Sequence, residues 1–237
     1  MRNLLRSVIK ALGYEVHRLG LPPYGANAMA DILRYSPKPL NTLIDVGANI
    51  GQTCEEFHRY FPNETIHAFE PVSTTYQRLA ENTRHFRNVT THATALGSHR
   101  GTATIWLQPN DQTNSLNAEL NVQTEKSEVI KITTLDAFAL ENGIQEIGLL
   151  KSDTENFDLD VIEGASGLLR EGRIGFVLSE VGIAKADTGH TNLFDLSERL
   201  IPDNFELMGL YDRLYHYQRP RVRSWCNALF IRRDLLD

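Results

Sequence analysis

The amino-acid sequence predicts a doubly wound α/β domain with a mostly parallel sheet of seven strands. Apolar segments of strand length alternate with segments of helical pattern, which is typical of such sheets. The first of them, residues 42–46, is mostly apolar, which fits a strand buried on both faces, and it runs into a turn with two glycines. We divide the chain into an N-terminal helical segment, residues 1–41, and the domain itself, residues 42–237.

The first half of the domain follows this alternation. Serine is a residue type that caps helix N-termini, so we expect Ser73 to cap the second helix. We expect strands at residues 42–46, 65–69 and 89–95, and helices at about residues 51–60 and 73–86.

An insertion follows the third strand. Residues 102–107 alternate in polarity and residues 129–133 offer a partner, so we expect an added antiparallel strand pair. The polar connection between them, about residues 108–128, is long for a loop inside a domain, and such loops are often functional. We therefore expect Ser115 and its neighbours to belong to a lid over a ligand.

The second half returns to the alternation of strand and helix. Its last two strands follow the final predicted helix. We expect strands at residues 147–152, 174–180, 205–210 and 227–231, and helices at about residues 159–169 and 193–200.

The glycine turn and the end of the second strand predict a nucleoside-cofactor site. Gly47 and Gly51 let the backbone approach a ligand closely, and Glu70 is placed to accept hydrogen bonds from two ribose hydroxyls. A dinucleotide site would need the spacing G-x-G-x-x-G, whereas this chain has G-x-x-x-G. S-adenosylmethionine carries no phosphate, and Asn49 and Thr53 offer polar contacts for its amino-acid part. The spacing therefore favours methyl transfer over hydride transfer.

Size, charge and cysteine content limit the kinds of partner and the location that the protein can have. The 237 residues suffice for one large α/β domain, and no apolar run approaches the roughly 20 residues that span a bilayer. The net charge of -6 gives no support for a nucleic-acid partner. Cys54 and Cys226 offer neither a disulfide framework nor metal-ligand spacing, and the start lacks a secretory leader, so we expect a cytoplasmic protein.

Residues 1–12 have the pattern of a basic amphipathic helix. Arg2, Arg6 and Lys10 alternate with apolar residues. Such a helix packs on its own domain or on a second subunit, or it rests on an anionic membrane surface. The sequence leaves these alternatives open, so peripheral membrane contact through residues 1–12 stays an expectation, and the oligomeric state is not predicted.

Short segments in a fixed order resemble those of the FkbM-type S-adenosylmethionine-dependent methyltransferases. The resemblance covers roughly residues 42–232, and the ordered set is far more specific than any one segment. The segments are Ile44-Asp45-Val46-Gly47-Ala48-Asn49-Ile50-Gly51, Phe69-Glu70-Pro71, Ala95-Leu96-Gly97 with Gly101-Thr102, Asn114-Ser115-Leu116, Thr134-Leu135-Asp136, Leu150-Lys151-Ser152-Asp153-Thr154-Glu155, Val161-Ile162-Glu163-Gly164-Ala165 and Asn227-Ala228-Leu229-Phe230.

The resemblance implies a Rossmann-like class I methyltransferase fold, in which the last two strands form a reversed hairpin in an otherwise parallel sheet. It also implies an O-methyltransferase that acts on a hydroxyl of a sugar, glycolipid, surface polysaccharide or small molecule. It implies that the glycine loop surrounds the methionine part of the cofactor, that Glu70 binds the ribose, and that the end of strand three binds the adenine. The residues expected at the cofactor are Asp45, Gly47, Ala48, Asn49, Gly51, Thr53, Glu70, Pro71, Thr94, Ala95 and Ser115.

The chain departs from the family pattern at the end of the fourth strand. That pattern reads lysine, apolar, aspartate, small or apolar, glutamate, glycine, whereas this chain has Ser152 at the apolar position and Asn156 in place of the glycine. Asparagine tolerates a left-handed backbone better than most residues, so we expect the turn to survive. We expect these changes to affect substrate preference and activity more than they affect cofactor binding.

The candidate catalytic residues follow the fourth and fifth strands, where ligands of open α/β sheets gather. A sugar hydroxyl must lose its proton to become a good nucleophile, and we name Asp153 as the first candidate base, with Glu155 and His190 as alternatives. The two acids have a structural alternative, in which they cap the next helix or pair with Lys151 and Arg173. No resident metal is expected, although Asp153 and Glu180 are the pair that would hold Mg²⁺ if one bound.

Two other functions remain open from the sequence. A nicotinamide-dependent oxidoreductase uses a similar fold, and the missing third glycine counts against it. A methyltransferase-like binding or scaffold protein would keep the cofactor site and lack turnover, and the changes at Ser152 and Asn156 are what suggest it.

Overall fold

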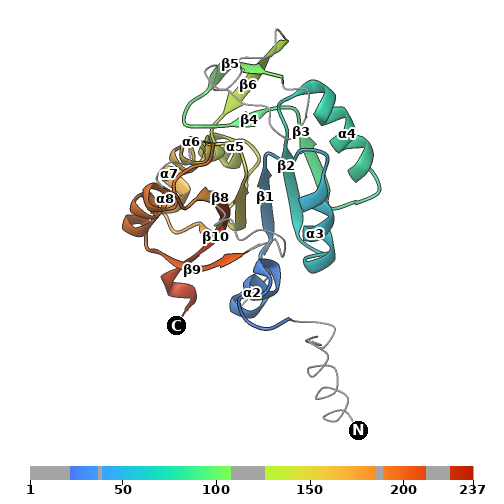
Figure 1. The fold of residues 1–237 in the computed structure, drawn as a ribbon. Helices are drawn as coiled ribbons and strands as arrows, with labels where there is room; N and C mark the ends of the chain where they lie inside the picture. Colours follow the sequence, from blue (N-terminus) through green and yellow to red (C-terminus); the bar gives the residue numbers. More distant parts are fainter. Residues whose placement is uncertain (1–21, 37–38, 108–125, 185–188, 212–224, 237) are drawn as a thin grey trace, which may run out of the picture.

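The structure is a computed structural model that describes residues 22–36, 39–107, 126–184, 189–211 and 225–236. The expected basic helix of residues 1–12 and the Ser115 lid lie outside the described residues. Within the described part of the chain, no helix is long and apolar enough to cross a membrane. The elements form a large central sheet, helices on both of its faces, and a small second sheet at one edge (Figure 1).

The central sheet confirms the predicted fold class. Its strand order is β3-β2-β1-β7-β8-β10-β9, and each neighbouring pair is parallel except the two pairs that include β10, which is the reversed strand. The strand order reverses between β1 and β7, and the carboxyl ends of such strands are where α/β sheets form ligand crevices. The strands are β1 (Thr42–Val46), β2 (Thr65–Phe69), β3 (Val89–His92), β7 (Ile147–Ser152), β8 (Ile174–Gly182), β9 (Phe205–Tyr211) and β10 (Trp225–Arg232).

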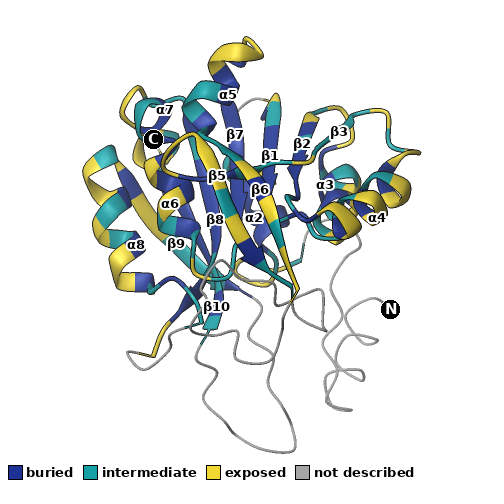
Figure 2. Cartoon of the chain, turned by 90° about the horizontal axis from the view of Figure 1, so that it is seen from above, coloured by how far each residue is buried: buried dark blue, intermediate teal, exposed yellow. Residues whose placement is uncertain are grey.

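Alternate residues of the central strands point into two separate cores. Leu43 packs in one core and Ile44 in the other, and Phe176 and Val177 divide in the same way. All four side chains are fully buried, which explains why these strands read as apolar runs. Figure 2 shows the buried central strands between the two helical layers.

Each face of the sheet is covered by its own set of helices. One core joins the sheet to α2 (Ala28–Tyr35), α3 (Gln52–Tyr60) and α4 (Ser73–Thr83). The other joins it to α5 (Leu135–Glu141), α6 (Asp158–Glu163), α7 (Ser166–Arg170) and α8 (Leu193–Leu200). Two short 3-10 helices, η3 (Ile201–Asp203) and η4 (Arg233–Leu235), complete the described elements.

The small sheet corrects the predicted insertion. In place of a strand pair it has the order β4-β6-β5, with β4 (Ala95–Leu96), β5 (Gly101–Trp106) and β6 (Ser127–Thr133). β5 and β6 are antiparallel as expected, and β4 adds a parallel strand on the other side of β6. The predicted strand at residues 89–95 was therefore too long, because β3 ends at His92 and the chain bends away so that Ala95 pairs with Ile132 of the small sheet.

Two helix predictions were also wrong in detail. The predicted helix at residues 159–169 is broken into α6 and α7 beside Gly164, where the chain passes so close to Gly97 that a Cβ at Gly164 would lie 2.1 Å from the Gly97 carbonyl oxygen. Ser73 does not cap α4, because it is the first helical residue and its hydroxyl donates to Glu128 at 3.0 Å. That helix also ends at Thr83, before the expected residue 86.

Candidate functional site

A cavity of about 410 Å³ lies at the carboxyl ends of β1, β2, β7 and β8. The small sheet contributes one apolar wall, and the turns that follow the four central strands contribute the rest. The described lining residues are Val46, Gly47, Ala48, Asn49, Gln52, Thr53, Phe69, Glu70, Pro71, Val72, Ala95, Leu96, Ile105, Ile130, Lys151, Asp153, Thr154, Glu155, Phe157 and Glu180.

The glycine loop is packed too tightly at Gly47 for any side chain. Gly47 has a φ of 75°, and a Cβ there would lie 2.0 Å from the carbonyl oxygen of Asp153. The backbone N–H groups of Gly47 and Ala48 both donate to the carbonyl oxygen of Phe69, at 3.1 and 3.0 Å. The loop is therefore fixed between the end of β2 and the turn that follows β7, with its backbone at the cavity wall.

Glu70 presents a buried carboxylate at one end of the cavity, which we call the first end. Its side chain is only 7% exposed, and its two oxygens accept hydrogen bonds from the backbone N–H groups of Asn49 at 3.2 Å and Val72 at 3.0 Å. Burial raises the pKa of Glu70 to about 7, and the two backbone donors oppose this rise. Each carboxylate oxygen has a further lone pair, so the group can also accept two donors from a diol.

A buried cation connects the glycine loop to the opposite end of the cavity. Nζ of Lys151 lies 3.1 Å from Oδ2 of Asp153 and 3.6 Å from Oδ1 of Asp45. Burial alone would lower the pKa of Lys151, but the charges of Asp153 and Asp45 raise it above its ordinary value. Asp45 is fully buried, and the thiol of Cys54 lies 3.6 Å from its other oxygen. Burial raises the pKa of Asp45 and of Cys54.

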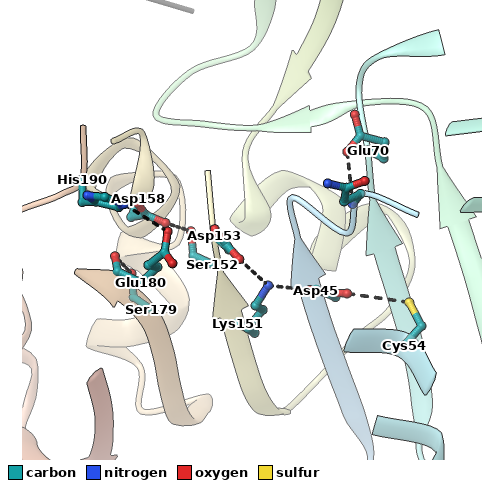
Figure 3. A network of polar contacts seen from close by, with 11 residues as sticks. Asp45, Cys54, Glu70, Lys151, Ser152, Asp153, Asp158, Ser179, Glu180 and His190 are labelled. Carbon is teal, nitrogen blue, oxygen red and sulfur yellow. Dashed lines mark hydrogen bonds and ion pairs between the residues drawn. The ribbon is translucent and has the colours of Figure 1, made fainter. Parts of the chain in front are cut away.

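The second end of the cavity is rich in carboxylates. Asp153, Glu155 and Glu180 all line it. Burial and then the charge of Asp153 raise the pKa of Glu155, and the same two causes raise the pKa of Glu180 to about 7. Glu180 also lies 3.5 Å from Nε2 of His190. In Figure 3, Glu70 lies on one side of the view and Glu180 on the other, with Lys151 between them.

The turn after β7 keeps its left-handed backbone despite the change from the family pattern. Asn156 has a φ of 78° and Glu155 a φ of 51°. Asp153 and Glu155 were also expected to cap the next helix or to pair with Lys151 and Arg173. The capping is wrong, because α6 begins at Asp158 and its N-cap is Phe157. Neither Asp153 nor Glu155 therefore caps that helix. The pairing of Asp153 with Lys151 is present, whereas the carboxylate that pairs with Arg173 in the described residues is that of Glu171, at 3.1 Å.

His190 lies behind the cavity wall. Its ring stacks on Trp225, with 5.5 Å between the ring centroids, and its described carboxylate neighbour is Glu180. Within the described part of the chain, no group of three or more histidine, cysteine, aspartate or glutamate side chains is arranged to hold a metal ion. Binding of Mg²⁺ by Asp153 and Glu180 stays a prediction.

The structure brings most of the predicted site residues to one cavity. The predicted cofactor residues in its lining are Gly47, Ala48, Asn49, Thr53, Glu70, Pro71 and Ala95. The described lining excludes Asp45, Gly51, Thr94 and His190. Asp45 lies behind the loop beside Lys151, and Gly51 packs against Thr83 and Leu79 of α4. Ser115 lies outside the described residues.

Several lining residues were missed by the sequence analysis. Ile105 and Ile130 enter the cavity from the small sheet, and Phe157 enters it from the turn before α6. Only the fold brings these apolar residues to the site, because they lie far apart in the sequence. Lys151 had a local signal, since a lysine inside an otherwise apolar strand needs a buried partner.

Two comparisons by sequence identify related proteins. The model of the family described as "Methyltransferase FkbM domain" matches residues 45–200. The protein named Methyltransferase 1, from Beauveria bassiana strain ARSEF 2860, is 25% identical over 142 residues. That match spans 52% of this chain and 57% of the fungal protein, so the chain covers little more than half the length of this curated relative.

Solved structures are also similar to the chain, at low sequence identity. A ribosomal protein L11 methylase from Lactobacillus delbrueckii subsp. bulgaricus has a TM-score of 0.48 and 16% identity, over 86% of this chain and 76% of that one. Aeropyrum pernix fibrillarin in complex with natively bound S-adenosyl-L-methionine has a TM-score of 0.47 and 12% identity, over 82% of this chain and 67% of that one.

Proposed function

Because the chain belongs to the FkbM methyltransferase family, we propose that it is an S-adenosylmethionine-dependent O-methyltransferase that acts on a hydroxyl of a sugar, glycolipid or surface polysaccharide. The observation that carries the proposal is the arrangement of one cavity, with a glycine loop and a buried carboxylate at one end and three carboxylates at the other. The first end suits a nucleoside cofactor. The second end suits an acceptor with several hydroxyl groups, and we call it the acceptor end.

The first end of the cavity fits S-adenosylmethionine in its shape and its hydrogen-bonding groups. The backbone at Gly47 forms the wall without a side chain, so a small amino-acid moiety can approach it closely. Glu70 has lone pairs for both ribose hydroxyls while it keeps its two backbone donors. Ile105 and Ile130 offer an apolar surface for the adenine ring.

The second end supplies the groups that an acceptor hydroxyl needs. S-adenosylmethionine, when bound, supplies a methyl group on a positively charged sulfur. The protein has to orient the hydroxyl and accept its proton, and orientation accounts for much of the catalysis in such displacements. Asp153 is the proposed base, because its carboxylate lines the cavity and is held by Lys151 at 3.1 Å.

Glu180 joins Glu155 and His190 as an alternative base. It lines the same end of the cavity, and a pKa near 7 is the value that suits a general base at neutral pH. From its place in the sequence, Glu180 suggested only a ligand for Mg²⁺. Replacement of each acid by its amide separates these alternatives.

The charge of the second end favours a neutral acceptor. Lys151 is the only lysine or arginine among the described lining residues, and it is already paired with Asp45 and Asp153. Glu155 and Glu180 face the same space without a second buried cation in the described lining. A carboxylated or phosphorylated acceptor would be repelled there, whereas sugar hydroxyls can donate hydrogen bonds to these groups.

Transfer of a labelled methyl group tests the proposal. The protein would be incubated with methyl-labelled S-adenosylmethionine and a panel of neutral methyl glycosides, the matching glycuronides and a neutral glycolipid. We expect label in a neutral acceptor as a base-stable methyl ether, with release of one equivalent of S-adenosylhomocysteine. Label in a base-labile ester would contradict the proposed acceptor group.

Ligand-binding measurements beside this experiment separate the two alternative functions. Stronger thermal stabilisation by NAD than by S-adenosylhomocysteine would favour the oxidoreductase. Binding of S-adenosylhomocysteine without methyl transfer to any member of the panel would favour the binding or scaffold protein.

A further inference from the structure

A fully enclosed polar cluster lies beside the second end of the cavity, outside the residues assigned so far. The Ser152 hydroxyl donates to Oδ1 of Asp158 at 2.5 Å, and the Thr191 hydroxyl donates to Oδ2 of the same residue at 3.0 Å. The three side chains are at most 1% exposed. Burial and the charge of Asp153 raise the pKa of Asp158, and hydrogen bonds from hydroxyl groups, among them those of Ser152 and Thr191, oppose this rise.

The cluster ties together the two segments that form the acceptor end. Asp158 is the first residue of α6 and directly follows the turn that carries Asp153, Glu155 and Phe157. Thr191 directly follows His190. One carboxylate therefore connects the turn with the candidate bases to the loop with the histidine.

Thr191 is held from two directions. Its carbonyl oxygen accepts from the backbone N–H of Gly182 at 2.8 Å, while its side chain bonds to Asp158. Loss of the hydroxyl alone would leave the backbone bond to β8 in place. The loop would then stay attached to the sheet but lose the bond that sets its distance from the turn after β7.

Ser152, the last residue of β7, supplies one of the hydrogen bonds that hold Asp158, and an apolar side chain at this position could not donate it. A buried carboxylate with one hydroxyl partner fewer would be less well satisfied, because unpaired buried oxygens are costly.

We propose that Asp158 is a positioning residue that, through Thr191, holds His190 against Glu180 and Trp225 and so sets the geometry of the acceptor end. The proposal rests on the proposed function for its catalytic meaning, since Glu180 lines the acceptor end of the cavity. Figure 3 shows Ser152 bonded to Asp158, with His190 and Glu180 close by.

Tryptophan fluorescence tests the positioning without any acceptor. The chain has two tryptophans, so the W106F background leaves Trp225 as the reporter beside His190. A histidine ring stacked on an indole quenches its fluorescence, so the emission of Trp225 reports whether the ring of His190 stays in place. H190A in the same background gives the signal without this quenching.

The test compares T191V, T191S and the surface control T102V. T191V removes the hydroxyl at nearly constant shape, T191S keeps it, and Thr102 is exposed on the small sheet. We expect T191V to lose most of the quenching that depends on His190, while T191S and T102V keep it. D158N should act like T191V but more weakly, because an amide oxygen can still accept one of the two bonds.

Wild-type quenching in folded T191V would overturn the proposal. Thermal unfolding and binding of S-adenosylhomocysteine serve as controls, and both should remain close to the wild type in T191V. If T191V were too unstable to measure, wild-type quenching in S152A and D158N together would overturn the proposal as well. A failure to transfer methyl groups would leave the fluorescence result intact, so the two proposals fail independently.

Discussion

The ammonium of Lys151 donates to Asp153 at 3.1 Å and lies 3.6 Å from Asp45 of the neighbouring strand β1. Because β1 ends in the glycine loop and Asp153 lines the acceptor end of the cavity, the two contacts together link the loop to that end. The strands pair so that Lys151 lies directly opposite Asp45. Parallel pairing at the reversal of strand order therefore joins the two halves of the site through one buried cation.

K151M should destabilise the protein strongly. The change leaves the fully buried Asp45 without its cation, and breaking a buried ion pair in this way costs about 3–5 kcal/mol. K151R is the matched control, and K151M/D45N should recover part of the loss. Urea unfolding measures it, and a K151M stability within about 0.5 kcal/mol of the wild type would show that the pair has no structural role.

D153N should remove turnover and leave cofactor binding unchanged. The amide keeps the size of the side chain but cannot accept a proton, so turnover should fall by about 10²–10⁴-fold if Asp153 is the base. E171Q, at an exposed acid, is the control. Near-normal turnover in D153N together with a comparable loss in E180Q would transfer the role to Glu180.

Cofactor affinity should fall as the pH is lowered through 7. The pKa of Glu70 in the free protein is raised to about 7 by burial, and ribose hydroxyls donate best to the charged carboxylate. Binding below this pH must release one proton, so the affinity should fall by at most about tenfold per pH unit and be constant above it. Calorimetry in two buffers of different ionisation enthalpy measures the released proton. Absence of proton release at pH 6 would contradict this prediction.

The free protein should show the opposite trend in stability for this group. The folded pKa of Glu70 is raised, so its contribution to stability is present at acid pH and is lost as the pH rises through about 7. This is the thermodynamic cost of a buried carboxylate placed to bind a ligand.

A half-buried histidine pair should make the protein sensitive to acid. Nδ1 of His67 lies 3.0 Å from Nε2 of His92, whose ring stacks on Phe69. Burial lowers the pKa of His67, and burial and the neighbouring His67 lower that of His92 to about 4. These folded pKa values lie below the ordinary histidine value, so the contribution to stability is present above about pH 6.5 and is lost as the pH falls toward 4.

Urea midpoints at pH 7 and pH 5 measure this effect. The midpoint should fall more between the two pH values in the wild type than in H92F, because phenylalanine cannot bind the proton. H99Q, which changes an exposed histidine, should fall as much as the wild type. Equal falls in the wild type and H92F would rule out the pair as the source of acid sensitivity.

The order of elements and the cofactor end could be predicted because their signals are local. Gly47 has a left-handed backbone that favours glycine, and Glu70 directly follows a strand whose limits are clear in the sequence. The fold class follows from the alternation of apolar strands and amphipathic helices. The helix α5 was missed although Thr134 accepts from the N–H of Ala137 in the usual manner of an N-cap.

The acceptor end could be predicted only in part, because its geometry depends on contacts between distant segments. Thr191 and Asp158 are 33 residues apart in the sequence, and Ser152 read only as a departure from the family pattern. Ile105 and Ile130 reach the cavity from the small sheet, which the chain enters at β4 after it leaves the central sheet at the end of β3. The continuous run at residues 89–95 did not indicate this change of sheet.

The central claim is that Glu70 and the glycine loop bind S-adenosylmethionine, and calorimetric titration of the wild type, E70A and the exposed control E81A with this cofactor tests it most directly. We expect one site in the wild type and E81A, no measurable binding of NAD, and at least about tenfold weaker binding in folded E70A, because each hydrogen bond to the carboxylate contributes about 1.5–3 kcal/mol. Equal affinity in E70A and the wild type, or tighter binding of NAD, would contradict the account.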